Sequence, residues 1–197
     1  RLSAAVLATL ALLVATLATP AQAQYTVQAG KIYDNLGREV QLRGVHWFGF
    51  ETDTYAPHGL WARNWQKMIA QMKSLEINAV RVPVCPDTLR GVSPKGIDYA
   101  LNPDLKGLNS LEILDKVMAE FSKQRMYVLL DHHRPDCEAI SELWYTDTYS
   151  EVQWINDLVF MAKRYRKYKY FIGLDLKNEP HGRATWATGN RATDWNH

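Results

Sequence analysis

The sequence contains few cysteines, and neither sign of charge is in large excess. Cys85 and Cys137 are the only two among 197 residues, so the chain can form at most one intramolecular disulfide. The 23 Lys and Arg residues are interspersed with 21 Asp and Glu, which leaves a net charge of +2. Proteins that bind nucleic acids present a clustered basic surface to the phosphates. A nucleic-acid partner is therefore not expected.

Long apolar runs are also missing after the first 24 residues, so no later segment is expected to span a membrane. The first 24 have one Arg, a middle rich in Leu, Ala and Val, and the sequence Ala21-Gln22-Ala23 before Gln24. This pattern is typical of a secretory signal peptide with an A-x-A cleavage site. We expect residues 1–23 to be a signal peptide and the mature protein to be secreted, extracellular or periplasmic, without a membrane partner. A membrane anchor is the alternative.

The two cysteines leave one question open. In an exported protein an even pair permits a disulfide. A bond between Cys85 and Cys137 would close a ring of about 53 residues and stabilise the fold by about 4 kcal/mol. Two unpaired thiols are the alternative.

What the sequence does contain is a regular alternation of strand-like and helix-like segments. Hydrophobic residues make up 47% of the chain, enough for a sizeable core. A β-hairpin is expected around the Asp-Asn-Leu-Gly turn at 34–37. Strands are expected at 40–50, 77–84, 126–133 and 170–180, and helices at 64–75, at 110–124 with Ser110 as N-cap, and from Ser150 with a Ser150/Gln153 capping box.

The expected strands are continuously apolar, which indicates a parallel sheet that is covered on both faces or closed into a barrel. Each ends in polar residues, as in a (β/α)₈ TIM barrel. A doubly wound sheet would often carry a Gly-rich phosphate loop, and no G-x-G-x-x-G follows any strand. A barrel takes about 250 residues and eight units. We therefore expect residues 24–197 to be the truncated N-terminal part of a barrel domain, with about four β/α units.

Five segments carry a family resemblance: VHWFGFET, HGLWARNWQKMIAQMKSLEINAVRVPV, LLDHHRPDC, LWYT and GLDLKNEPHG. Together they resemble glycoside hydrolase family 5, and in particular its bacterial secreted endo-β-1,4-glucanases (cellulases). The resemblance covers the chain from Tyr25 onward. Asn-Glu-Pro alone is a weak motif, but its position after the fourth strand, with matching motifs on the second and third, is specific.

The resemblance implies roles for four residues. Glu179 matches the general acid/base, and Asn178 the amide that holds the 2-hydroxyl of the sugar. Arg81 matches the arginine that supports the nucleophile, and His133 a histidine near the cleaved sugar. The nucleophilic Glu of the family belongs to a seventh strand, which has no counterpart here. An alternative for Glu179 without its motif is an ion pair with Lys177.

The resemblance also concerns the disulfide partner of Cys137. Relatives carry a Cys at the position of Asp53, bridged to the equivalent of Cys137. Cys85 is a possible substitute partner for Cys137 in this chain.

Two further groups of residues have candidate roles. Trp61 and Trp47 are candidate sugar-binding residues, because flat apolar rings suit sugar faces; Trp144 and Trp186 are weaker candidates, and Trp65 and Trp154 are expected in the core. The cluster His132, His133, Asp136 and Cys137 suggests a metal site, but adjacent strand residues point to opposite faces and the spacing matches no common zinc pattern. No metal is expected.

These observations predict an exported, retaining endo-β-1,4-glucanase that acts on cellulose or related β-glucans without a cofactor and is a monomer when full length. Mannan, xylan or xyloglucan are alternative substrates for the same mechanism. A non-catalytic glycan-binding protein or an inactive remnant is the alternative of another class. The DNA downstream of His197 would discriminate between them.

Overall fold

The computed structural model describes residues 25–196, so the predicted signal peptide at 1–23 lies outside the described residues. The chain divides into two compact units, one up to Glu39 and one from Val40. Among the described residues, no helix is long and apolar enough to cross a bilayer.

The first unit is built on short antiparallel strands. β1 (Tyr25–Gln28) pairs with β2 (Lys31–Asp34), and β3 (Glu39–Val40) completes a sheet of order β1-β2-β3. The Asp34 carbonyl accepts the Gly37 N–H at 3.0 Å, and the Asp34 side chain accepts the Leu36 N–H at 2.9 Å. The predicted turn at 34–37 is confirmed and connects β2 to β3.

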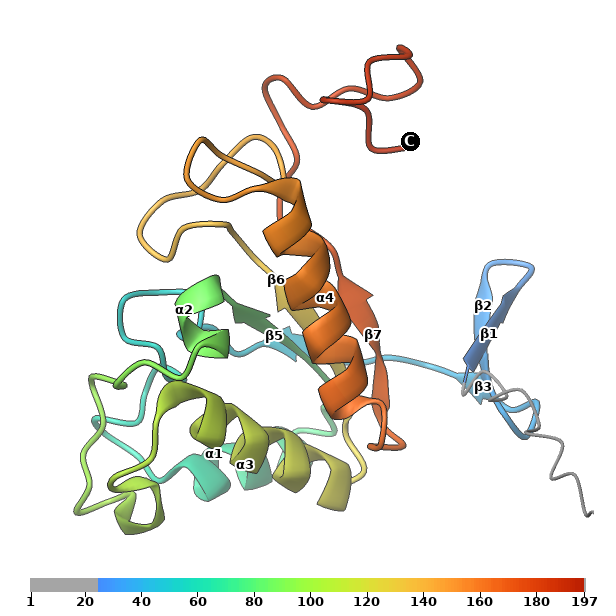
Figure 1. Ribbon diagram of the computed structural model, residues 1–197. Helices are drawn as coiled ribbons and strands as arrows, with labels where there is room; N and C mark the ends of the chain where they lie inside the picture. The colour runs from blue at the N-terminus through green and yellow to red at the C-terminus, as the bar shows by residue number, and fades with distance from the viewer. Residues whose placement is uncertain (1–24, 197) are drawn as a thin grey trace, which may run out of the picture. The chain divides into compact units, whose positions relative to one another are not determined.

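The second unit is a parallel sheet with helices between its strands (Figure 1). The strands are β4 (Gly44–His46), β5 (Ala79–Val84), β6 (Tyr127–His132) and β7 (Phe171–Asp175), hydrogen-bonded in that order. The helices are α1 (Trp65–Ser74), α2 (Pro86–Leu89), α3 (Ser110–Lys123) and α4 (Glu151–Tyr165), with a 3₁₀ turn at Pro103–Leu105. Four parallel strands with helices between them confirm the α/β prediction; within residues 25–196 the fourth unit has its strand, β7, but no helix after it.

The two faces of this sheet have different chemistry because successive strand residues point to opposite sides. One face is apolar and packs on α1, α3 and α4; its buried strand residues are Val80, Val82, Val84, Val128 and Leu130. On the opposite face the register places His46 beside Arg81, and Asp131 beside both Pro83 and Asp175. The sheet therefore separates a hydrophobic core from a charged interior.

Capping residues define where the helices begin. The predicted capping box of Ser150 and Gln153 is confirmed at the start of α4. At α3 the prediction was wrong: Asn109, not Ser110, is the N-cap, and it forms a capping box with Glu112. Ser110 is buried and donates its hydroxyl to the Thr88 carbonyl at 3.0 Å, so it bonds to the neighbouring helix α2 instead of capping its own helix.

Two strands are shorter than predicted. The strand expected at 40–50 is formed only at Gly44–His46, because the chain turns away at Gly49, where φ is +132°. The strand expected at 170–180 ends at Asp175, the last residue paired with β6. The Asn178-Glu179 dipeptide therefore lies in the loop after β7 and not on the strand itself.

A disulfide joins Cys85 and Cys137, with the Cα atoms 5.3 Å apart. Cys85 directly follows β5 and Cys137 lies in the loop after β6. The bond therefore links two neighbouring loops at the carboxyl end of the sheet.

Replacing Gly49 by Ala should destabilise the fold strongly. A Cβ there would lie 2.2 Å from the Ala56 carbonyl oxygen and 2.5 Å from the His58 nitrogen, both backbone atoms that cannot move alone. We expect a loss of about 3 kcal/mol in the free energy of unfolding, measured by chemical denaturation. Gly107→Ala is the control: φ is also positive (+82°) but nothing lies within 4 Å, so about 1 kcal/mol is expected. Equal losses would contradict the steric argument.

Candidate functional site

The candidate site is built around Arg81, whose guanidinium joins groups from several elements at the carboxyl edge of the sheet. Its Nε and Nη2 donate to Asp175 Oδ2 at 3.0 and 2.7 Å. Nη2 also donates to Asn178 Oδ1 at 3.1 Å and lies 2.9 Å from Asp131 Oδ2. Because the Arg81 side chain is only 13% exposed, these partners compensate for the loss of hydration of its charge.

Asp131 connects Arg81 to His133. The Asp131 side chain is completely buried, and its Oδ2 lies 2.5 Å from His133 Nδ1. This contact engages Nδ1, so Nε2 is the ring nitrogen of His133 that can bind a ligand. The His133 backbone N–H donates to the Val84 carbonyl at 2.9 Å. Both its ring and its backbone are therefore fixed at the edge of the sheet.

Asn178 and Glu179 follow β7 in an unusual backbone conformation. Asn178 Oδ1 is occupied by Arg81, so its amide NH₂ is the part left to bind a ligand. Glu179 is exposed and has φ of +47°, in the left-handed region that non-glycine residues rarely adopt. Within residues 25–196 its carboxylate takes part in no hydrogen bond or ion pair.

The alternative of an ion pair between Glu179 and Lys177 is not formed. Lys177 is 5% exposed, and its Nζ donates to the Asn178 carbonyl at 2.6 Å. Burial lowers the pKa of the Lys177 ammonium, and the nearby carboxylates of Asp131 and Glu179 oppose this shift. Sequence reasoning missed this buried lysine, since Lys is almost never fully buried without a partner.

The tryptophan predictions separate into exposed and buried rings. Trp61 is 55% exposed and lies edge-to-face with His58, which in turn contacts Phe48. For Trp47 the prediction was wrong: the ring is 5% exposed, packs on Phe121, and donates its indole N–H to the His58 carbonyl at 3.0 Å. Trp47 is a core residue, because it follows His46, which lies beside Arg81, and its side chain therefore points to the opposite, apolar face of the sheet.

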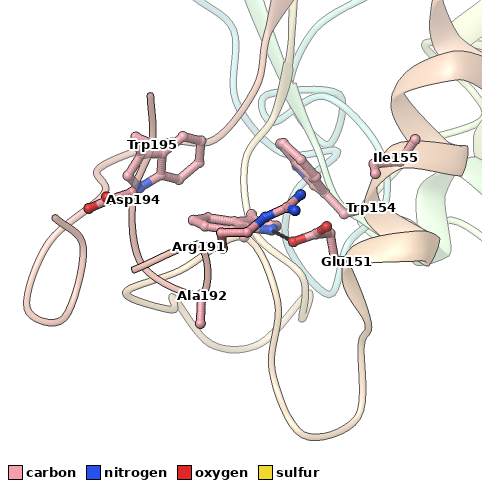
Figure 2. A pocket seen from close by; sticks show the side chains of 8 residues that line it. Glu151, Trp154, Ile155, Arg191, Ala192, Asp194 and Trp195 are labelled. Atoms are coloured by element: carbon pink, nitrogen blue, oxygen red, sulfur yellow. Dashed lines mark hydrogen bonds between the residues drawn. The ribbon is translucent and has the colours of Figure 1, made fainter. Parts of the chain in front are cut away.

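A pocket of about 430 Å³ lies between the start of α4 and the segment after β7 (Figure 2). Trp144, Trp154 and Trp195 line it, together with Glu151, Ile155, Arg191, Ala192 and Asp194. Trp144 is buried and donates its indole N–H to Glu151 Oε2 at 2.9 Å. None of the predicted catalytic residues lines this pocket. Trp186, the other weaker candidate, is 70% exposed.

The two adjacent histidines lie in different places: His133 at the candidate site and His132 in the protein interior. His132 is fully buried, and its Nε2 lies 3.0 Å from the Tyr149 hydroxyl, which donates to Asp157 at 2.7 Å. Burial of Asp157 raises its pKa, but hydrogen bonds from His132, Tyr149 and Arg90 reverse this, so the net pKa is lowered. Between residues 25 and 196, no group of three His, Cys, Asp or Glu side chains is arranged to hold a metal.

Parallel strands that deliver charged groups to one rim define the chain as part of a (β/α)-barrel catalytic domain. The profile described as "Cellulase (glycosyl hydrolase family 5)" matches residues 34–197. The chain belongs to this family.

Individual relatives are similar over most of this chain. The major extracellular endoglucanase of Xanthomonas campestris pv. campestris is 59% identical over 95% of the chain, and an endoglucanase of Paenibacillus polymyxa is 44% identical over 87%. The chain spans only 39% and 43% of those proteins.

Solved structures show the same relationship. The catalytic domain of the Xanthomonas enzyme matches with 61% identity and a TM-score of 0.85, covering 87% of this chain and 50% of that domain. A cellotetraose complex of the Pyrococcus horikoshii endocellulase matches with 46% identity and a TM-score of 0.84, covering 88% of this chain and 51% of that one. The chain thus corresponds to about half of a barrel domain.

Arg81→Lys should destabilise the protein, because one ammonium cannot replace a guanidinium that contacts four side chains at the rim: Asp131, Asp175, Asn178 and, at 3.4 Å, His46. We expect a loss of about 2–4 kcal/mol in the free energy of unfolding, measured by chemical denaturation.

Arg90→Lys is the matched control. Arg90 pairs with a single carboxylate, Asp157, at 3.1 Å, and its side chain is 44% exposed, so a loss of about 1 kcal/mol or less is expected. A loss at Arg81 no larger than at Arg90 would contradict the role of Arg81 as the centre of the network.

Proposed function

We propose that this chain forms the N-terminal half of the catalytic domain of a secreted, retaining endo-β-1,4-glucanase. The observation that carries the proposal is the position of the Asn178-Glu179 dipeptide. It follows β7 at the carboxyl rim, with Asn178 bonded to the Arg81 network, in a chain 59% identical to an extracellular endoglucanase. Cellulose or a related β-glucan is the proposed substrate, in line with the cellotetraose complex of a 46% identical relative.

Glu179 is the proposed general acid/base. In the first step its carboxyl group protonates the departing glycosidic oxygen, and in the second the resulting carboxylate takes a proton from the attacking water. The Asn178 NH₂ is positioned to donate to the 2-hydroxyl of the sugar, because its oxygen is held by Arg81. The Nε2 of His133 is the proposed contact for the sugar at the cleaved bond, since Nδ1 is held by Asp131.

The nucleophile of this reaction must come from elsewhere in the complete enzyme. A retaining mechanism needs a second carboxylate about 5–5.5 Å from the acid/base. Asp131 and Asp175 are the carboxylates bonded at this rim, and both are engaged by Arg81. Neither is available to attack an anomeric carbon. The resemblance to the family places the nucleophilic Glu on a later strand of the barrel.

The proposal also includes a sugar-stacking residue, the absence of a cofactor, export and a monomeric state. Trp61 is the proposed sugar-stacking residue, because an exposed ring next to His58 offers a flat apolar face. No cofactor is needed for acid/base hydrolysis by two carboxyl groups. We expect export through residues 1–23 and a monomeric complete enzyme.

Glu179→Gln in the complete enzyme should reduce the hydrolysis of carboxymethyl-cellulose by about 10³-fold, because glutamine cannot transfer a proton. Glu76→Gln is the control: Glu76 is also exposed and also has a positive φ (+59°), but it precedes β5 at the other end of the sheet. The activity of the Glu76→Gln variant should be unchanged. Retention of activity by the Glu179 variant would refute the assignment. Parallel assays on mannan, xylan and xyloglucan would test the choice of polymer.

A further inference from the structure

The backbone at Glu179 is held in its strained conformation by two side chains that the proposed chemistry does not use. Left-handed φ costs a non-glycine residue about 1–3 kcal/mol and persists only where surrounding contacts enforce it. Such strain is often found at functional sites. The contacts around Glu179 therefore indicate what sets the direction of its carboxyl group.

The φ angle of Glu179 is the rotation that relates the carbonyl carbons of Asn178 and Glu179. Each of these two carbonyl groups accepts one side-chain hydrogen bond. Lys177 Nζ donates to the Asn178 oxygen at 2.6 Å, and His181 Nδ1 donates to the Glu179 oxygen at 2.7 Å. The two bonds therefore restrain the carbonyl groups on both sides of this φ angle.

Lys177 is placed to form its bond firmly. The side chain is 5% exposed, so water competes little for the ammonium group. Asp131, Glu179 and Asp175 surround it with negative charge, whereas Arg134 is the nearby cation. A lysine nitrogen remains a donor in the charged and the neutral form, so the bond does not depend on its protonation.

The segment beyond Glu179 is also anchored. Arg183 Nε donates to Glu142 Oε2 at 2.7 Å, and the His181 backbone N–H donates to the Glu142 carbonyl at 3.4 Å. Glu142 lies in the loop after β6, so His181 acts from a segment that is fixed to a neighbouring loop. Figure 1 shows that both segments extend from the same end of the sheet.

We propose that Lys177 and His181 are positioning residues, which clamp the two carbonyl groups flanking the φ angle of Glu179 and so aim its carboxyl group at the glycosidic oxygen. The proposal rests on Glu179 as acid/base. Without the clamp, the backbone relaxes toward ordinary φ values and the carboxyl group moves away. Proton delivery is then impaired, while the sugar contacts of Trp61 are kept.

The test compares two substrates that differ in their need for an acid. In the complete enzyme, Lys177→Met should lower kcat/KM for phenyl β-cellobioside by about 100-fold, the effect of a misplacement of about 1 Å. The value for 2,4-dinitrophenyl β-cellobioside should fall less than about 3-fold, since its leaving group departs with little protonation. A merely structural role would lower both values equally.

Lys116→Met is the matched control, because Lys116 also donates to a backbone carbonyl, that of Asp104, at 3.0 Å, but from the outer helix α3. Both substrates should then react nearly as in the parent enzyme. If Lys177→Met does not fold, the His181→Ala variant provides the test of the clamp. His181 is exposed, so removal of its side chain should leave the fold intact. It should show the same selective loss for the phenyl substrate.

Equal loss on both substrates, or no loss, in the decisive variant would overturn the clamp while leaving Glu179 as the acid. An active Glu179→Gln variant would instead overturn the proposed function itself. The two failures are therefore distinguishable.

Discussion

The rim depends on one buried cation that is shared by several elements. Arg81 extends from β5 and bonds to carboxylates on β6 and β7 and to the amide of Asn178. Burying a guanidinium is costly unless its hydrogen bonds and charge are satisfied. Removal of either carboxylate would leave the charge of Arg81 with one anionic partner in place of two, so the network holds β5, β6 and β7 in fixed relative positions. The geometry of the rim is thus a consequence of providing hydrogen-bond acceptors and opposite charge for the buried guanidinium of Arg81.

The same constraint couples strand register to chemistry. Because strand side chains alternate between faces, a shift of one residue in β6 would send Asp131 into the apolar core and expose Leu130 to Arg81. The hydrophobic face opposes that shift, since Val128 and Leu130 are both buried against the helices. Core packing and the charged network therefore select the same register. Loops are fixed to one another as well: the Cys85–Cys137 disulfide joins the loops after β5 and β6, and the Glu142–Arg183 pair joins those after β6 and β7.

Much of this architecture could be predicted because it is encoded in short-range patterns. Continuous apolar runs indicated the parallel strands, and the Ser150/Gln153 pair indicated the start of α4. The errors arose where long-range contacts decide. Trp47 is in the core because its ring packs on Phe121 of α3, and Ser110 is not a cap because it bonds to Thr88 of α2. Neither partner is visible in the local sequence.

The proposed catalytic dipeptide, Asn178-Glu179, shows the same limit more clearly. The Asn-Glu-Pro motif identified it in the sequence, but no pattern indicated that Lys177 and His181 would donate to its two carbonyl groups. A lysine two residues before a glutamate suggests an ion pair, but the buried Lys177 donates to the carbonyl of Asn178 instead.

That choice has a chemical consequence. An ion pair would hold Glu179 as the anion, whereas a general acid must stay protonated until the bond breaks. With the lysine bonded to the backbone, the carboxyl group is left unpaired within the described chain.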